Sequence, residues 1–280
     1  MESIKEVIAS GKTKDILAEL DNATEALVRS KKAITAGDGD SRIDMEGKDV
    51  LATTIAVNCF RLLNAKHIPT HFLEQVDANT FRAVRLRMMP IEVVIRDCSY
   101  GSRNKRYPHE TKGKPYARPI VEFFYKDDTN HDPLMIWDHE RERFSLYNAG
   151  IPAEHENAKM GAVSWKENPL LPKHIGDLDK IEELAIESFI IFRDAFAALG
   201  VRLVDMKKEF GYDKDGVIRI GDVIDSESSR LWIGGDENCA IDKDYFRKIA
   251  KLKRPFTPAE LAKILSDYAV VAHLTSLFLE

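Results

Sequence analysis

Cysteine is scarce in this sequence of 280 residues, which has only three such side chains. Cys59, Cys98 and Cys239 are odd in number, lie far apart and show no C-x-x-C spacing. Neither a disulfide framework nor a zinc site follows from this pattern. The scarcity excludes the disulfide-rich class of small secreted domains and predicts a protein of a reducing cytoplasm.

Long apolar runs and blocks of one charge are also missing. Residues 1–6 contain no apolar signal core, and we find no apolar run that approaches membrane-spanning length. The formal net charge is -5, with basic and acidic residues mixed throughout the chain. These absences exclude a nucleic-acid footprint and a polybasic membrane patch, so we expect small-molecule partners, no nucleic acid and no membrane.

The pattern of apolar residues predicts an α+β protein, long enough to bury a good core. Helical spacing predicts helices over 46–66, 178–199, 242–252 and 258–279. Strands are expected within 8–17, 26–36, 71–76, 81–88, 91–97 and 119–126. Closely spaced strands pair antiparallel by default. We expect a surface loop over 103–118 and an insertion over 138–172 with little regular structure beyond 143–147.

A hairpin over 203–224 gathers ionisable residues on one face of its first strand. Side chains alternate faces along a strand, so Asp205, Lys207 and Glu209 point to the same side. The second strand brings a further acid, Asp222, after an Asp-Gly turn. The hairpin is therefore the first candidate site.

The register of the hairpin has two candidates. A two-residue turn would set Glu209 opposite Asp222, whereas a four-residue loop would pair Lys207 with Asp222. In either register Asp222 joins the charged face, beside Ile218 and Ile220. Like charges opposed across strands destabilise a sheet unless a positive group lies between them.

Two explanations for the charged face remain open at this stage. It is either a solvated surface with a Lys207 to Glu209 charge pattern, or a site for a divalent metal. In the second case Glu209 and Asp222 hold the metal while Lys207 faces phosphate oxygens, since Mg²⁺ takes a few carboxylates plus substrate phosphates. Ile218 and Ile220 argue against full solvation, but spacing alone favours neither explanation.

Two further segments have residues that suit an anionic ligand. Gly-Lys-Thr-Lys at 11–14 lacks the spacing of the P-loop motif, yet such a turn offers backbone N-H groups and two cations to a polyphosphate. Arg96 lies near the end of a strand, ahead of Gly101 and Ser102, which suits a phosphate or carboxylate. The plainer alternatives are an exposed turn for the first segment and a Glu92 to Arg96 ion pair for the second.

Six segments, in the same order along the chain, resemble motifs of the SAICAR synthetase family, phosphoribosylaminoimidazole-succinocarboxamide synthase. The sequence Asp-Met-Lys-Lys-Glu-Phe-Gly at 205–211 is similar to the family's D-x-K-x-E-F-G motif. The other five segments are 11–14, 88–96 with 101–102, 122–128 with 132–133, 229–232 and 242–247. The match spans residues 11 to 247 and is specific.

The resemblance implies an α+β fold with two domains. Residues 1–97 would form a mainly antiparallel nucleotide-binding domain, and 98–280 an α/β domain related to ATP-grasp enzymes, with an insertion near 138–172. The implied reaction joins CAIR and L-aspartate, with ATP, to give SAICAR, ADP and phosphate in purine biosynthesis. Because a carboxylate is a poor electrophile, we expect an acyl phosphate before the amine attacks.

The resemblance also implies roles for individual residues. Those expected at the chemical step are Lys207, Asp205 and Glu92. Those expected to bind ATP are Gly11, Lys12, Lys14, Met89, Glu209 and Asp222, the last two through Mg²⁺. Those expected to place CAIR and aspartate are Arg96, Ser102, Asp128, Arg230, Lys243 and Arg247. A homo-oligomer is implied by the family alone.

The chain departs from the family pattern in two motifs, and its 103–118 and 138–172 segments are longer than the family leads us to expect. Where the family usually has D-E-[IL]-[ST]-P-D before S-R-x-W, this chain has Asp-Val-Ile-Asp-Ser-Glu at 222–227. Tyr100 stands where the family prefers a small residue or threonine before Gly-Ser. A divergent carboxylate-amine ligase and a non-catalytic nucleotide-binding protein are therefore kept as alternatives to SAICAR synthesis.

Overall fold

Two antiparallel sheets carry most of the fold in the computed structural model, which describes residues 5–19, 22–36, 41–152 and 154–280. The smaller sheet has the strand order β1-β2-β3-β7-β6. Its strands are β1 (Lys5–Ser10), β2 (Lys14–Glu19), β3 (Asn22–Ser30), β7 (Thr80–Val84) and β6 (Phe72–Asp77). A separate hairpin joins β4 (Ala33–Ala36) to β5 (Ser41–Asp44).

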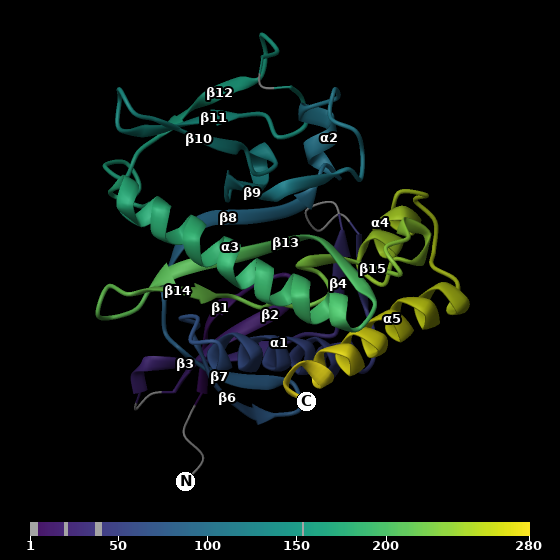
Figure 1. The fold of residues 1–280 in the computed structure, drawn as a ribbon. Helices are drawn as coiled ribbons and strands as arrows, with labels where there is room; N and C mark the ends of the chain where they lie inside the picture. Colours follow the sequence, from purple (N-terminus) through teal and green to yellow (C-terminus); the bar gives the residue numbers. More distant parts are fainter. Residues whose placement is uncertain (1–4, 20–21, 37–40, 153) are drawn as a thin grey trace.

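The larger sheet has the order β12-β11-β10-β9-β8-β13-β14, with β15 also paired to β13. Its central strands are β8 (Arg87–Cys98), β9 (Pro115–Tyr125) and β13 (Val201–Tyr212). The outer strands are β10 (Leu134–Asp138), β11 (Arg143–Tyr147), β12 (Lys159–Val163), β14 (Ile218–Gly221) and β15 (Ser229–Ile233). Figure 1 shows the larger sheet stacked above the smaller one, with β13 and β14 near the junction.

Helices cover the sheets with their apolar faces. The helix α3 (Ile175–Ala198) packs on β13 and β8 through a buried stripe that includes Phe189, Phe192 and Phe196. The helix α1 (Lys48–Ala65) packs between the smaller sheet and α5 (Pro258–Ser276). A capping box of Thr257 and Glu260, with Pro258 in the first turn, starts α5. Shorter helices are α2 (Ser102–Arg106) and α4 (Asp244–Ala250), with 3₁₀ turns at Asp128–Asn130, Glu237–Cys239 and Leu277–Leu279.

The expected helices and most expected strands are present, and the α+β class is confirmed. Two expectations were wrong. The region 138–172 contains β11 at the expected 143–147, but it also contains β12, which extends the larger sheet beyond β10 and β11. Phe144 of β11 is buried in the main core. The segment 103–118 contains α2 and the start of β9 rather than a plain loop, and its Arg106 is buried. The strand β7 belongs to the smaller sheet and β8 to the larger one. The division into two domains at residue 97 stays a prediction.

The C-terminal helix is an exception to the expectation that no apolar run approaches membrane-spanning length. Within the described residues, Pro258–Leu279 is long and apolar enough, by length and composition, to cross a membrane. The core helix of a globular domain meets the same criterion. Ile264, Tyr268, Val271 and Ala272 are buried in the main core, and the helix packs on α1. The apolar character of α5 is therefore explained by packing inside this fold.

Candidate active site

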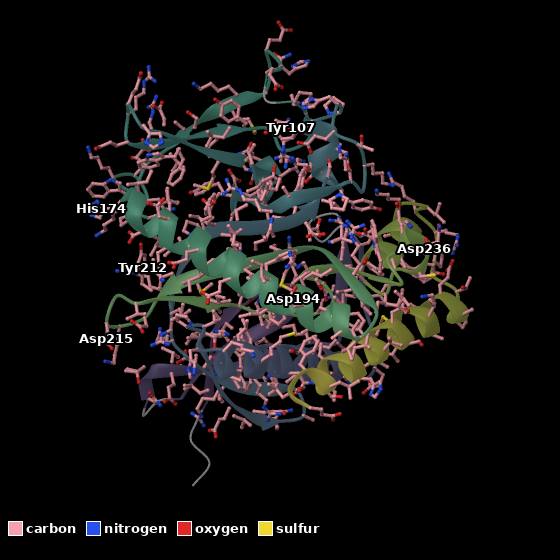
Figure 2. All side chains as sticks on the ribbon, viewed as in Figure 1. Tyr107, His174, Asp194, Tyr212, Asp215 and Asp236 are labelled. Atoms are coloured by element: carbon pink, nitrogen blue, oxygen red, sulfur yellow. The ribbon has the colours of Figure 1, made fainter. Side chains whose placement is uncertain are left out.

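The hairpin of β13 and β14 has a register that neither sequence candidate gave. Glu209 stands opposite Gly221, and Phe210 opposite Ile220, because the turn spans the five residues 213–217. Figure 2 labels Asp215 within this turn. Ile218 and Ile220 therefore lie on the buried side with Phe210, not on the charged face. The expectation that Glu209 or Lys207 pairs directly with Asp222 was wrong.

Asp222 reaches the charged face by another route. It follows the last residue of β14 and has a φ of +59°, a left-handed conformation that aspartate tolerates better than most residues. The turned backbone places its carboxylate in the same cavity as Glu209. There it forms an ion pair with Lys14 from β2.

Gly211 allows β13 to lie very close to the start of β8. A Cβ atom at this position would lie 2.9 Å from the carbonyl oxygen of Arg87 and 2.9 Å from Cβ of Leu86. The register between β13 and β8 shifts at this point, between Glu209 and Gly211. A side chain here would force the strands apart, which explains a glycine directly after the charged row.

The charged row on β13 faces one acid on β8. Glu209 stands opposite Glu92, and the Lys207 ammonium lies 2.5 Å from Glu92 Oε1 and 3.4 Å from Glu209 Oε1. Lys126 adds a second ion pair to Glu209 at 2.8 Å. Burial raises the pKa of Glu209, but Lys207, Lys126 and Lys14 outweigh it and lower this pKa to about 2. The side chain of Glu209 is only 7% exposed, so the solvated-face explanation was wrong.

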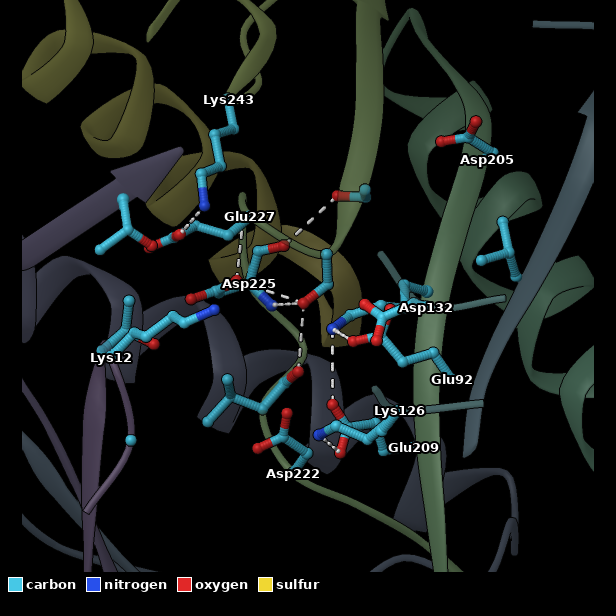
Figure 3. Close-up of a pocket in the computed structure, with 18 of the residues that line it drawn as sticks. Lys12, Glu92, Lys126, Asp132, Asp205, Glu209, Asp222, Asp225, Glu227 and Lys243 are labelled. Carbon is cyan, nitrogen blue, oxygen red and sulfur yellow. Dashed lines mark hydrogen bonds and ion pairs between the residues drawn. The ribbon is translucent and has the colours of Figure 1, made fainter. Parts of the chain in front are cut away.

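A polar cavity of about 590 Å³ opens over this row, between the two sheets. Figure 3 shows Glu92, Glu209 and Asp222 on one side of it and Lys243 and Glu227 on the other. Fourteen of the fifteen predicted site residues line this cavity: Gly11, Lys12, Lys14, Glu92, Arg96, Ser102, Asp128, Asp205, Lys207, Glu209, Asp222, Arg230, Lys243 and Arg247. The sequence prediction and the geometry thus converge on one place in the molecule.

The remaining predicted residue, Met89, lines a second cavity of about 700 Å³. Its walls are mostly apolar and come from β1, β2, β3, β7, the β7–β8 connection and the start of β8, including Ile16, Val28 and Met88. The two cavities share Gly11, Lys14, Lys126, Glu209 and Asp222. An apolar chamber therefore adjoins a charged one, with the 11–14 turn at the junction.

The 11–14 turn connects the two sheets electrostatically. Lys12 pairs with Asp128 at 3.1 Å, across the cavity, and both side chains stay largely exposed. Lys14 is more enclosed, and burial lowers its pKa to about 8 in spite of Glu209 nearby. The turn thus brings two cations to the cavity at different depths.

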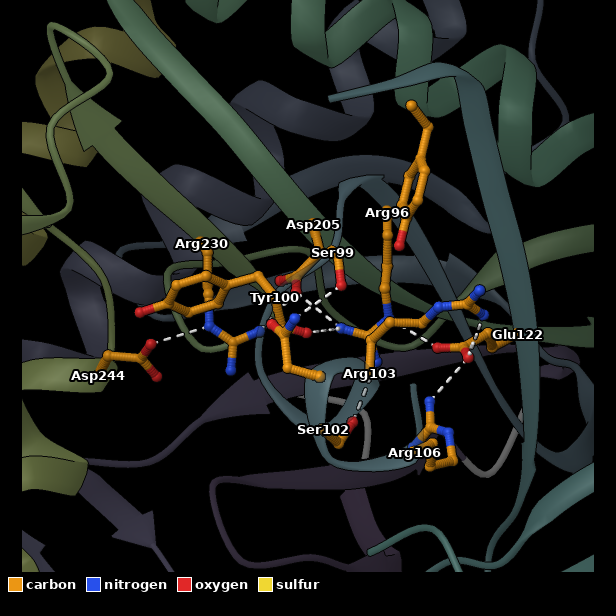
Figure 4. A network of polar contacts seen from close by, with 12 residues as sticks. Arg96, Ser99, Tyr100, Ser102, Arg103, Arg106, Glu122, Asp205, Arg230 and Asp244 are labelled. Carbon is orange, nitrogen blue, oxygen red and sulfur yellow. Dashed lines mark hydrogen bonds and ion pairs between the residues drawn. The ribbon is translucent and has the colours of Figure 1, made fainter. Parts of the chain in front are cut away.

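A network of arginines and acids forms the opposite end of the cavity (Figure 4). Arg96 donates to Glu122 at 2.7 Å, to Asp205 at 2.9 Å and to Ser102 Oγ at 3.1 Å. Arg230 donates to the same Asp205 oxygen at 2.5 Å. The acidic partners of Arg96 in this network are Glu122 and Asp205, so the simple Glu92 to Arg96 pair was wrong.

Several residues of the site were missed in the sequence. Glu122 accepts hydrogen bonds from Arg96, Arg103 and Arg106, at 2.7 to 3.0 Å. Glu227 pairs with Lys48 at 2.6 Å and with Lys243 at 2.5 Å. Burial raises the pKa of Glu227, but the two lysines outweigh it and lower this pKa to about 2. The partners come from distant segments, so only a tertiary contact could reveal them.

The comparisons with known proteins agree with this geometry. A family model described as SAICAR synthetase matches residues 7–257. The chain is 36% identical over 269 residues to the phosphoribosylaminoimidazole-succinocarboxamide synthase of Chloroflexus aggregans, covering 96% of this chain and 95% of that protein. It is 37% identical over 245 residues to a bifunctional purine synthesis protein of Dictyostelium discoideum, covering 88% of this chain but only 22% of that longer protein.

A solved structure supports the same assignment. A SAICAR synthetase in complex with ADP superposes with a TM-score of 0.76 at 29% identity, covering 97% of each chain. The fold, the paired cavities and these matches define a carbon–nitrogen ligase of purine biosynthesis. The chain belongs to the SAICAR synthetase family.

Proposed function

We propose that this chain joins CAIR and L-aspartate, with consumption of ATP, to give SAICAR, ADP and phosphate. The observation that carries the proposal is the junction of an apolar cavity with a charged cavity at the 11–14 turn. An apolar chamber suits a nucleobase, and a chamber rich in lysine and arginine suits phosphates and carboxylates. A three-substrate ligase needs both.

The ATP site is assigned across the two cavities. The base lies in the apolar chamber beside Met89, and the phosphates pass Gly11 and Lys14 toward Lys207. Glu92 and Glu209 hold the Lys207 ammonium through ion pairs. Burial lowers the pKa of Lys207, but the two acids outweigh burial and raise this pKa, so Lys207 carries a full positive charge. A fixed ammonium at this place stabilises charge on the transferring phosphoryl group.

Glu209 and Asp222 fit a Mg²⁺ ion bound with the nucleotide. Among the described residues no group of three or more His, Cys, Asp or Glu side chains forms a metal site, so the protein alone offers too few ligands for a cage. Two carboxylates plus phosphate oxygens is the donor set that Mg²⁺ prefers. The low pKa of Glu209 keeps it ionised, and both acids are neutralised by lysines that phosphates would also attract. The ion would neutralise phosphate charge during transfer.

The CAIR phosphate is assigned to the arginine network. Arg96 and Arg230 are oriented by Asp205, and Ser102 adds a hydroxyl to the same place. Lys243 and Arg247 line the cavity further along and are suited to the carboxylates of CAIR and aspartate. This order of cationic residues predicts the order of the bound groups along the cavity: ATP first, then the CAIR carboxylate, then the aspartate amine.

The chemistry follows in two steps. A carboxylate oxygen of CAIR attacks the γ-phosphorus and ADP leaves, which gives an acyl phosphate. The aspartate amine then attacks the acyl carbon, phosphate leaves with that oxygen, and the amine loses a proton to form the amide. Lys207 and the 11–14 turn stabilise the negative charge that moves in the first step.

Oxygen labelling tests the proposal. CAIR with ¹⁸O in its carboxylate should yield phosphate that contains one labelled oxygen, detected by mass spectrometry. Unlabelled phosphate alongside labelled SAICAR would contradict the acyl phosphate route. ADP formation without SAICAR would favour a ligase for another acid and amine.

A cytoplasmic location and a homo-oligomer remain further predictions. Cys59 and Cys98 are buried free thiols, which supports a reducing compartment. Sedimentation of the purified chain is the direct test of its oligomeric state.

A further inference from the structure

Tyr100 contacts both arginines of the assigned phosphate site. Its carbonyl oxygen accepts a hydrogen bond from Arg96 Nη1 at 3.3 Å. Its ring centroid lies 5.2 Å from Cζ of Arg230, within the range of a cation–π contact. Figure 4 shows Tyr100 next to Arg230 in the network. This residue is also one of the two departures from the family pattern found in the sequence.

Arg230 is held on several sides. Its Nε donates to Asp244 at 2.8 Å and its Nη1 to Asp205 at 2.5 Å. A Cβ atom added to Gly101 would lie 3.1 Å from both Nη atoms, so the backbone there encloses the guanidinium closely. Nη2 has no hydrogen bond within the described part of the chain, and Arg230 lines the polar cavity. One edge of the guanidinium thus stays available to a ligand.

The Tyr100 ring is itself fixed from outside the cavity. Its hydroxyl donates to Glu237 Oε1 at 2.7 Å, and Lys112 pairs with Glu237 at 2.8 Å. Burial and the bond to Glu237 raise the pKa of Tyr100, so the phenol stays protonated and remains a donor. An edge contact with Trp232, at a centroid distance of 5.0 Å, completes the packing. The 99–114 segment is thereby joined to the turn at Glu237.

We propose that Tyr100 is a positioning residue that fixes Arg230 for the substrate phosphate, with Glu237 and Lys112 holding its ring. The inference rests on the proposed function, which assigns this phosphate site to CAIR. An arginine that is free to change rotamer loses conformational entropy when it binds, and the ring removes part of that cost beforehand. A smaller residue at 100 would leave this face of the guanidinium open.

Steady-state kinetics of two variants test the proposal. Tyr100→Leu keeps an apolar side chain but removes the aromatic face, and it should raise KM for CAIR roughly tenfold with kcat within about twofold. Tyr100→Phe restores the ring without the hydroxyl and should recover most of the affinity. KM for ATP should not change in either variant. A fall in kcat at constant KM for CAIR, or no rescue by phenylalanine, would overturn the proposal.

Tyr212 provides a matched control. Its hydroxyl donates to Asp177 at 2.8 Å and Arg87 lies over its ring at 5.3 Å, so it has the same chemistry as Tyr100. It lines neither cavity, and Figure 2 shows it on the opposite side of the molecule from Asp236, the neighbour of Glu237. Tyr212→Leu should leave KM for CAIR within twofold. An effect equal to that of Tyr100→Leu would mean that general loosening, not positioning, explains the result.

A binding measurement separates this inference from the proposed function. Ribose 5-phosphate, titrated calorimetrically into the parent and the Tyr100→Leu protein, probes the phosphate site without turnover. Weaker binding to the variant, by roughly tenfold, supports the positioning role even if SAICAR is not formed. Equal binding to both proteins would overturn it even if the parent is an active SAICAR synthetase.

Discussion

Glu92 and Glu209 stand directly opposite each other on β8 and β13, and the Lys207 ammonium lies between their carboxylates. Two opposed acids would repel each other without such a cation. The arrangement therefore fixes Lys207 in place and keeps it charged. It is the link between the sheet geometry and the proposed phosphoryl transfer.

Loss of this ammonium should abolish efficient turnover. We expect Lys207→Ala to lower kcat by about a hundredfold or more, because one fixed charge at the transition state is removed. Lys214→Ala is the control, since Lys214 lies exposed in the turn of the same hairpin. Circular dichroism and a coupled assay for ADP would measure fold and rate together. Turnover within twofold of the parent would remove Lys207 from the mechanism.

Asp222 should set the requirement for Mg²⁺. Asp222→Asn keeps a residue that tolerates the left-handed backbone at φ +59°, but it removes the charge. We expect the Mg²⁺ concentration for half-maximal activity to rise about tenfold or more. Calorimetric titration of ATP with and without Mg²⁺ gives a readout that does not depend on turnover. Asp215→Asn, an exposed acid in the same hairpin, should change neither quantity.

The buried Lys208 should destabilise the folded protein. It is fully buried on the core side of β13, where its ammonium nitrogen lies 2.7 Å from Ser188 Oγ, and burial lowers its pKa well below the ordinary value. Lys208→Met should raise the free energy of unfolding by about 1 to 3 kcal/mol, since Ser188 keeps its bond to the Leu184 carbonyl. Urea denaturation would measure the change. Lys180→Met, at an exposed site on α3, should have little effect, and a destabilised Lys208→Met would contradict the account.

Asp242 should make stability depend on pH. Burial, with Asp244 nearby, raises its pKa from 3.8 to about 6. Folding favours the protonated carboxyl of Asp242. Its contribution to the free energy of unfolding is fully present below about pH 3.8 and is lost as pH rises through 6. From pH 4 to pH 7.5, the free energy of unfolding of Asp242→Asn should rise by up to about 3 kcal/mol relative to that of the parent. Urea titrations at both pH values would measure it, and a constant difference would refute it.

The chemistry of the site could be predicted from the sequence to a large extent. Strand alternation placed Asp205, Lys207 and Glu209 on one face, and the ordered motifs named the residues that line the two cavities. The strand alternation is local, because it depends only on residue type and period. The other site residues came from the resemblance of short segments to the motifs of a known family.

Features that depend on tertiary contact could not be predicted. The five-residue turn and the left-handed Asp222 set a register that neither simple turn rule gave. The cluster of arginines around Glu122 includes Arg106 of α2, which is buried and also donates to the Ala149 carbonyl at 2.8 Å. The strands β10 and β12 have weak alternation and are formed by pairing with β9 and β11.

The most direct test of the central claim is an omission assay for ADP release. The purified protein is incubated with ATP, Mg²⁺, CAIR and L-aspartate, one component is left out at a time, and the product is identified by mass. We predict that turnover needs all four and that SAICAR is the product. A folded protein that binds ATP but makes no SAICAR from the full mixture would contradict the account.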